Sequence, residues 1–151
     1  MTRWRLAALL IGAMFVVRCG GPAGPGPAEG GALELFDLEP DERITLTMRD
    51  IAFGVERLTI EAGSLVAIEL TNSGEIEHDL SIARIEGDQA FRIDGTPGAG
   101  GGGGGYALHV RLSAGASAEV RLRIDEPGEY EFFCAVPGHR RAGMRGTLVV
   151  R

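Results

Sequence analysis

Lysine is absent from this chain, and the residues that most often bind metals are few. The 15 basic residues, all arginine, are outnumbered by 21 aspartate and glutamate residues, which gives a net charge of −6. A protein that binds nucleic acid needs a basic surface to neutralise phosphate, so this balance excludes nucleic acid as an expected partner. Only two cysteines and three histidines are present, so few residues can act as strong metal ligands.

A hydrophobic run long enough to span a membrane is also lacking at the N-terminus. Arg3 and Arg5 give a positive start, and an apolar stretch of 12 residues follows at 6–17. This stretch is too short to span a bilayer comfortably and matches the core of a signal peptide. A buried N-terminal helix is disfavoured because a stretch rich in glycine and proline follows at once. We therefore predict a signal peptide, or a lipoprotein or membrane anchor, over residues 1–19.

Cys19 lies where this segment ends, and residues 16–20 resemble the cleavage box of bacterial lipoproteins, in which the cysteine is lipidated. Arg18 departs from the small residue expected before that cysteine, and an uncleaved anchor or ordinary cleavage nearby are the alternatives. Residues 20–42, rich in glycine and proline and then acidic, are predicted to form a flexible linker. A disulfide bond between Cys19 and Cys134 is rejected because Cys19 would lie in this flexible region.

From residue 43 onward, hydrophobic residues alternate with polar ones in several short segments. Such alternation is typical of strands buried on one face. Turn residues separate the segments at 62–64, 72–74 and 126–128. The pattern predicts an all-β domain over residues 43–151, a sandwich or barrel, and excludes a doubly wound α/β fold. The residues expected to face the core include Ile44, Leu46, Met48, Val66, Ile68, Leu70, Leu108, Val110, Leu112, Val120, Leu122, Ile124, Tyr130 and Phe132.

Six consecutive glycines at 100–105 interrupt this pattern. They lack the Gly-Lys-Ser/Thr ending of a phosphate-binding loop, and no helical pattern follows them. We therefore predict a mobile surface loop there.

The segment after the predicted strand that ends near residue 133 contains most of the candidate metal ligands. Cys134, His139 and Met144 lie within eleven residues, and the glycines before His139 and Met144 predict turns that bring the three side chains together. A thiolate with imidazole and a distant thioether is the ligand set of a mononuclear blue-copper site. This set needs a second histidine. His78 opens a predicted strand with its side chain on the core face and is favoured, whereas His109 is predicted to face solvent.

Other metals and an enzyme fit these residues less well. Structural zinc sites use four strong Cys or His ligands, and iron–sulfur clusters use four cysteines, or two cysteines and two histidines in Rieske centres. A catalytic dyad, with His78 or His139 activating Cys134, leaves Met144 unexplained, and no oxyanion-hole motif is evident. Copper is favoured because thiolate and thioether suit Cu(I) and imidazole suits both oxidation states.

Two motifs resemble those of the cupredoxins, the small blue-copper proteins that include plastocyanin, azurin and auracyanin. The first is Cys134-x4-His139-x4-Met144, with Val-Pro-Gly before the histidine and Gly-Thr-Leu-Val-Val near the end. The second is the segment 72–80, Asn-x-Gly-x-x-x-His-Asp-Leu. The resemblance covers about residues 43–151, and the C-terminal motif is most similar to auracyanin and sulfocyanin-like members.

The resemblance implies a Greek-key β-sandwich that binds one copper ion, as Cu(I) or Cu(II). It implies His78, Cys134 and His139 as strong equatorial ligands and Met144 as a weak axial ligand. A binuclear copper centre would need two cysteines in this loop. Asp79 matches the position where family members often carry an asparagine that ties the two ligand loops together, and such contacts orient ligands.

The resemblance also implies that the protein carries single electrons through the edge of His139 and is not an enzyme. Arg140, Arg141 and Arg145 accompany this histidine, and residues 135–146 contain no acidic residue. We expect these arginines to steer an acidic redox partner. Expected partners are c-type cytochromes or membrane-bound respiratory or photosynthetic complexes.

The leader implies an exported monomer at the periplasmic or extracellular face of a membrane, where a tether raises its effective concentration. The alternative is a copper delivery or storage protein of the cell envelope.

Overall fold

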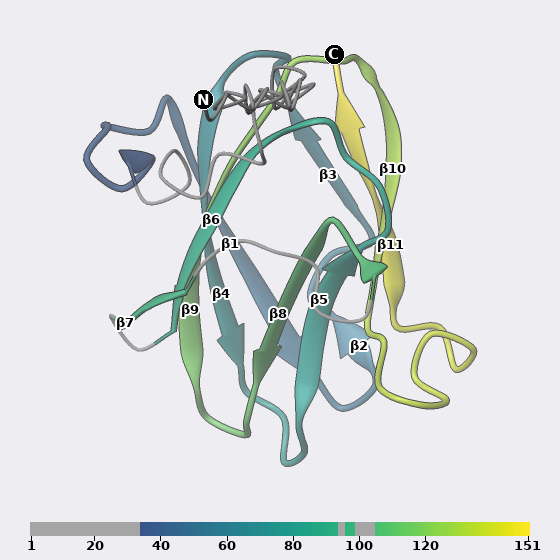
Figure 1. Cartoon of the computed structure of the whole chain (residues 1–151). Helices are drawn as coiled ribbons and strands as arrows, with labels where there is room; N and C mark the ends of the chain where they lie inside the picture. The colour runs from purple at the N-terminus through teal and green to yellow at the C-terminus, as the bar shows by residue number, and fades with distance from the viewer. Residues whose placement is uncertain (1–33, 94–95, 99–104) are drawn as a thin grey trace, which may run out of the picture.

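The computed structural model describes residues 34–93, 96–98 and 105–151. Within them, eleven strands form two sheets that pack face to face (Figure 1). The first sheet has the order β2-β1-β4-β9-β6-β7, and the second has the order β3-β11-β10-β5-β8. Strands distant in sequence lie side by side, as in a Greek key, and the predicted all-β sandwich is confirmed. The strands are β1 (Glu42–Arg49), β2 (Ala52–Phe53), β3 (Arg57–Ile60), β4 (Leu65–Asn72), β5 (His78–Ile82), β6 (Gly87–Ile93), β7 (Thr96–Gly98), β8 (Leu108–Leu112), β9 (Ser117–Ile124), β10 (Gly128–Phe133) and β11 (Arg145–Val150).

The core between the sheets contains most of the side chains that the alternation predicts. In β4, for example, Val66, Ile68 and Leu70 are at most 3% exposed. Full burial of one such side chain contributes about 1.5–3 kcal/mol, so this core supplies the main stabilisation. Ile44 and Tyr130 are only partly buried and pack against its edge. The other predicted core residues that are buried are Leu46, Met48, Leu108, Val110, Leu112, Val120, Leu122, Ile124 and Phe132.

Strand β5 departs from the expected pattern because all five of its residues are buried. It lies between β10 and β8 in the second sheet, and it pairs antiparallel with both. One face points into the core, and the other is also covered, although it carries Asp79 and Ser81. A strand that buries polar side chains must give them hydrogen-bond partners, and these partners are described below.

The outer face of the first sheet is also partly covered. Leu35 is only 3% exposed and forms a small hydrophobic cluster with Leu65 and Ala90, against which Phe36 packs. The backbone continues this attachment, since Asp41 N–H donates to Leu65 O at 2.8 Å and Leu65 N–H donates to the Asp41 carboxylate at 2.8 Å. We call residues 34–41 the N-terminal clasp.

Arg121 of β9 contacts the clasp and helps to hold it on the sheet. The alternation places this residue among the outward polar side chains, yet it is only 6% exposed. Its guanidinium donates to Glu119 at 2.7 Å and to the backbone oxygen of Leu38 at 3.2 Å. The Phe36 ring contacts two cations, with its centre 3.9 Å from Arg92 Cζ and 5.5 Å from Arg121 Cζ. The clasp therefore helps to bury Arg121, a residue that the alternation pattern predicts to be exposed.

The alternation did not predict the short strands β2 and β7, nor strands β3 and β6. Leu58 and Ile60 of β3 alternate correctly, but the segment is only four residues long. It pairs in parallel with β11 at the far end of the chain, so its partner could not be inferred locally. In β6, only Ala90 is fully buried, which explains the weak hydrophobic signal.

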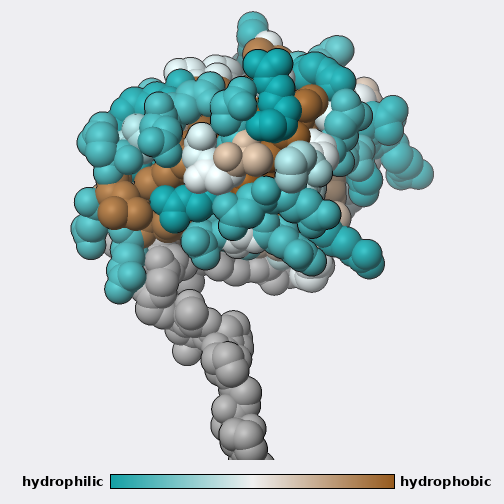
Figure 2. Space-filling view, turned by 90° about the horizontal axis from the view of Figure 1, so that it is seen from above, coloured by the Kyte–Doolittle hydropathy of each residue, from teal (hydrophilic) through white to brown (hydrophobic). Residues whose placement is uncertain are grey.

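The predicted leader at 1–19, most of the predicted linker and most of the glycine run lie outside the described residues. The boundaries of these segments stay predictions, and residues 34–41, at the end of the predicted linker, pack on the first sheet as the clasp. Among the residues that the structure describes, none forms a helix with the length and apolar character needed to cross a lipid bilayer. Viewed from the end of the sandwich that carries the C-terminus, the surface is mainly hydrophilic, with hydrophobic side chains showing between polar ones (Figure 2).

Candidate metal centre

The predicted ligands meet at the end of the sandwich where β5 begins and β10 ends. His78 is the first residue of β5, and Cys134 directly follows β10. The antiparallel pairing of these two strands brings Ser81 opposite Phe133, so the start of β5 runs alongside the residues that follow β10. The β10–β11 loop then turns back at this end, as its yellow trace shows in Figure 1.

The loop from Cys134 to Met144 closes on itself through its own backbone. Gly138 and Gly143 both have positive φ angles, 93° and 107°, which supply the two predicted turns. Met144 N–H donates to His139 O at 3.0 Å, and Cys134 N–H donates to Met144 O at 3.1 Å. The three predicted ligands of the loop are therefore tied together at the backbone.

The ligand atoms of His78, Cys134 and His139 all lie within 4.8 Å of one another. Nδ1 of each imidazole faces the sulfur, at 4.0 Å for His78 and 3.5 Å for His139. His78, Cys134 and Met144 are fully buried, and His139 is 9% exposed. His78, Cys134 and His139 supply three strong donors, and Met144 adds a buried thioether in the loop that carries Cys134 and His139. This set fits a copper ion better than a zinc site, which uses four strong ligands.

Burial sets the protonation of these groups in the metal-free protein. Burial raises the pKa of the Cys134 thiol, although backbone N–H groups of Asp79 and Val136 act in the opposite direction. Burial, followed by the nearby His139, lowers the pKa of His78. The site therefore favours a neutral thiol and a neutral His78 imidazole, and a metal that binds there must displace the thiol proton.

Asp79 ties the two ligand segments together, as the family resemblance implies. Its carboxylate oxygen Oδ1 accepts from the Ala135 N–H at 2.7 Å and from the Ser81 hydroxyl at 2.9 Å. Its own N–H donates to Cys134 Sγ at 3.4 Å. Contacts of this kind fix the direction of a metal ligand.

His109 differs from its prediction as a solvent-facing residue. It is half-buried on β8, its Nδ1 lies 2.9 Å from Ser81 Oγ, and its ring lies 5.7 Å from that of Tyr106. It is not among the clustered ligands. The sequence pattern placed it on the polar face of its strand but gave no sign that a hydroxyl from β5 lies opposite.

The arginines of the metal loop are less isolated than the sequence suggested. Arg140 forms an ion pair with Glu131 and lies over the ring of Phe133, 4.0 Å from its centre. Arg145 lines a hollow together with Glu131 and Glu56. Within the described part of the chain, neither Arg141 nor Arg145 has an ion pair or a side-chain hydrogen bond, but only Arg145 lies beside acidic residues in this hollow. Arg141 is therefore the arginine of the loop with the fewest acidic neighbours.

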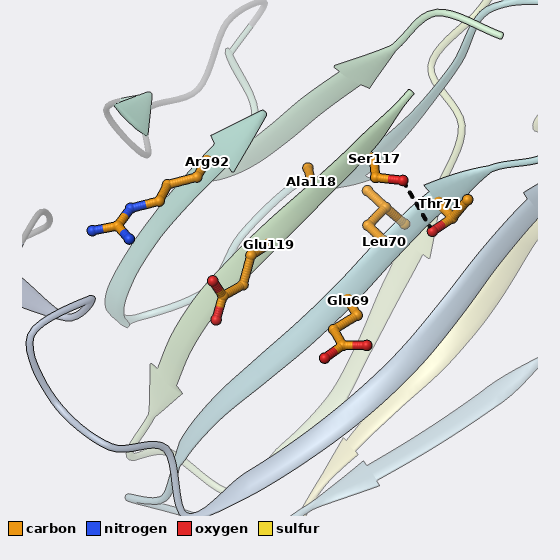
Figure 3. A pocket seen from close by; sticks show the side chains of 7 residues that line it. All are labelled: Glu69, Leu70, Thr71, Arg92, Ser117, Ala118 and Glu119. Atoms are coloured by element: carbon orange, nitrogen blue, oxygen red, sulfur yellow. Dashed lines mark hydrogen bonds between the residues drawn. The ribbon is translucent and has the colours of Figure 1, made fainter. Parts of the chain in front are cut away.

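A second hollow, of about 410 Å³, lies over the outer face of the first sheet (Figure 3). Glu69, Arg92 and Glu119 surround it, and Thr71 and Ser117 hydrogen-bond to each other at its edge. Glu119 is already paired with Arg121. This hollow lies on the opposite sheet from the converging ligands, so we place the functional site at the Cys/His cluster.

The fold and the ligand cluster together define the class of copper-binding β-sandwiches. A family model described as "Cupredoxin-like domain" matches residues 28–150, and the chain belongs to this family. Cupredoxins bind copper, and the residues that would hold it here are His78, Cys134, His139 and Met144.

Two curated relatives agree with this assignment. The chain is 32% identical over 114 residues to the copper-resistant cuproprotein CopI of Rubrivivax gelatinosus, which covers 70% of this chain and 61% of the relative. It is 28% identical over 117 residues to auracyanin-B of Chloroflexus aurantiacus, which covers 66% of this chain and 47% of the relative. The chain thus spans about half to three-fifths of the length of these relatives.

Solved structures show the same fold. Auracyanin B superimposes with a TM-score of 0.57 at 24% identity, covering 76% of this chain and 91% of that one. A multicopper oxidase gives a TM-score of 0.61 at 17% identity, but only 45% of its chain is covered. At such identities the likeness shows the fold alone, and this fold occurs in both kinds of protein.

Proposed function

We propose that this protein carries single electrons at a type 1 copper centre. The observation that supports this most is the closed arrangement of the ligands. Cys134, His78 and Met144 are fully buried, and only the ring of His139, at 9% exposure, approaches the surface. An electron can pass through such a ring, whereas a substrate would need an open coordination position.

Copper, when bound, supplies a one-electron couple between Cu(I) and Cu(II). The chain supplies ligands suited to both states, since thiolate and thioether favour Cu(I) and imidazole binds either. The two sheets and the loop hydrogen bonds hold these ligands in place, which limits their movement when the charge of the metal changes.

An enzymatic role for Cys134 is disfavoured. A reactive cysteine needs access to substrate and a lowered pKa. Here the thiol is fully buried and its pKa is raised by that burial. We therefore propose that the protein is not an enzyme.

The test is reconstitution of the purified protein with Cu(II), followed by visible and electron paramagnetic resonance spectroscopy. We expect an intense thiolate-to-copper band that disappears in Cys134→Ala. Cys134→Ala should keep the β-sheet circular dichroism of the parent, which separates loss of the ligand from loss of the fold. A colourless complex in the folded parent protein would contradict the proposal.

The second candidate is copper delivery or storage, and it is favoured by the 32% identity to a copper-resistant cuproprotein. A delivery protein must release its metal, whereas a carrier must keep it. Transfer of bound Cu(I) to a chelator within seconds would favour delivery. Retention for hours, together with fast electron exchange with a soluble redox reagent, would favour the carrier.

We further propose that the protein is exported and works as a monomer at the outer face of a membrane. Its partners would be c-type cytochromes or membrane-bound respiratory or photosynthetic complexes with an acidic docking surface. The predicted leader and the exposed Arg141, in the same loop as His139, support this proposal. Fractionation of cells that express the full chain, with and without Cys19→Ala, tests both export and the lipid anchor.

A further inference from the structure

A chain of hydrogen bonds runs from the strand of the first ligand into the neighbouring strand. The Ser81 hydroxyl lies 2.9 Å from Asp79 Oδ1 and 2.9 Å from His109 Nδ1. Ser81 and His109 face each other in the β5–β8 register, and Ser81 also pairs with Phe133 of β10. The positions of these groups are therefore set by paired strands and not by a flexible loop.

The Asp79 carboxylate, at one end of this chain of hydrogen bonds, lacks a cationic partner in the part of the protein that the structure describes. Asp79 is fully buried, its Oδ2 has no hydrogen-bond partner, and no ion pair reaches it from the described residues. A buried charge is costly unless hydrogen bonds compensate it. The compensation comes through Oδ1, which accepts from Ala135 N–H and from the Ser81 hydroxyl.

The direction of the hydrogen bonds follows from the number of protons available. The Ser81 hydroxyl has a single proton, which it donates to Asp79. It must then accept at its second contact, so His109 must carry a proton on Nδ1. Donation thus runs from His109 to Ser81 and from Ser81 to Asp79.

We propose that Ser81 and His109 are positioning residues of the copper centre. They fix the Asp79 carboxylate, which holds the Ala135 backbone, while the Asp79 N–H holds Cys134 Sγ. The direction of the thiolate is therefore set from β8, one strand beyond β5. This role does not depend on the proposed function, because an electron carrier and a delivery protein would both need the same thiolate orientation.

The first test is the tautomer of His109 in the metal-free protein. Heteronuclear NMR at about pH 8, where free imidazole is neutral, should show the proton on Nδ1. A proton on Nε2 with Nδ1 bare would reverse the chain and overturn the proposal.

The second test measures amide exchange at Ala135 in metal-free variants. Ser81→Ala and His109→Phe should each speed exchange at this amide by about tenfold, the scale of one hydrogen bond. His109→Gln, which keeps an N–H donor, should restore most of the protection. Ser113→Ala is the matched control because Ser113 is exposed in the loop after β8. Exchange at Leu122 in the core, unchanged in all variants, separates this local effect from global unfolding.

The third test uses the copper-loaded protein and its reduction potential. Ser81→Ala leaves the negative charge of Asp79 less compensated, which favours Cu(II) and should lower the potential. His109→Phe should shift it in the same direction by less, and His109→Gln should match the parent. The proposal is overturned if both the Ala135 exchange and the potential of Ser81→Ala and His109→Phe equal those of Ser113→Ala.

Discussion

Among the described residues, the acid Asp79 and the base Arg121 are buried, one in each sheet, and their charges are compensated to different extents. Arg121 in the first sheet is compensated by Glu119, by a backbone carbonyl and by the ring of Phe36. Asp79 in the second sheet receives hydrogen bonds on one oxygen only. Arg121 holds a polypeptide segment in place, whereas Asp79 keeps a net negative charge beside the metal ligands. The comparison suggests two roles for a buried charge. The paired charge of Arg121 attaches residues 34–41 to the sheet, whereas the charge of Asp79, which has no ion-pair partner in the described ranges, would act electrostatically on a bound metal.

The largest expected effect comes from breaking the paired charge. Arg121→Ala removes the ion pair, the bond to Leu38 O and the contact with Phe36, and should lower the free energy of unfolding by about 2–4 kcal/mol. Urea unfolding followed by circular dichroism measures it. Arg123→Ala, two residues along the same strand, should change stability by less than about 0.5 kcal/mol. Both variants should keep the copper spectrum of the parent protein. A changed spectrum in Arg121→Ala would show that Arg121 also influences the metal centre and would contradict the comparison.

Neutralising the other charge should affect the metal more than the fold. Asp79→Asn keeps an acceptor oxygen for Ala135 and Ser81 but removes one negative charge, which should raise the reduction potential by on the order of 50–100 mV. Redox titration of the reconstituted protein measures this shift. Asp88→Asn removes the same charge at an exposed position in β6 and should leave the potential unchanged. Equal shifts in the two variants would mean that net charge, and not the position of Asp79, is responsible.

The dependence of stability on pH gives a smaller effect. The pKa of His78 is lowered by burial and by His139, so the folded metal-free protein favours the neutral ring more than the unfolded chain does. The stability from this group is present above about pH 6.5 and is lost as the pH falls through the lowered pKa. The slope is at most about 1.4 kcal/mol per pH unit for one proton. Urea unfolding at a series of pH values measures this dependence. As the pH falls, the free energy of unfolding should decrease less in His78→Gln than in the parent, and an equal decrease would contradict the prediction.

The smallest effect is expected at the surface near the ligand loop. Arg141→Ser should slow oxidation of the reduced protein by anionic hexacyanoferrate(III) by roughly two- to fivefold at low salt, because one attractive charge is lost. Stopped-flow measurements at several salt concentrations should show the difference vanishing as screening increases. Arg140→Ser should have a weaker effect because Glu131 already pairs with it. A cationic oxidant provides the control. Because Arg141 repels it, it should oxidise Arg141→Ser at the same rate as the parent protein or faster.

Most of the ligand set could be predicted because its information is local. Cys134, His139 and Met144 lie in one loop, and the glycines at 138 and 143 force the turns that gather them. His78 could be chosen as the second histidine because only His109 competed with it outside the loop, and His109 lay on a polar strand face. The structure brings His78 within 4.8 Å of the ligand atoms of Cys134 and His139. The strand pattern also predicted most of the core for the same reason, since alternation is read along the chain.

The buried polar residues could not be predicted in the same way. Arg121, Asp79 and Ser81 all occupy positions that alternation assigns to the outer face, and each is buried. Their burial depends on what covers that face, and the cover comes from segments distant in sequence, such as Phe36 over Arg121. No local pattern carries this information.

The sequence by itself predicted the β-sandwich class, the Cys134–His139–Met144 loop and His78 as the remaining candidate ligand, because these follow from residue type, short-range spacing and strand periodicity. The tertiary structure alone decided that residues 34–41 pack on the first sheet, that Glu131 pairs with Arg140, and that His109 meets Ser81. Strand register is the physical reason. A shift of one residue between β5 and β8 would turn Ser81 away from His109, and nothing within either strand alone sets that register.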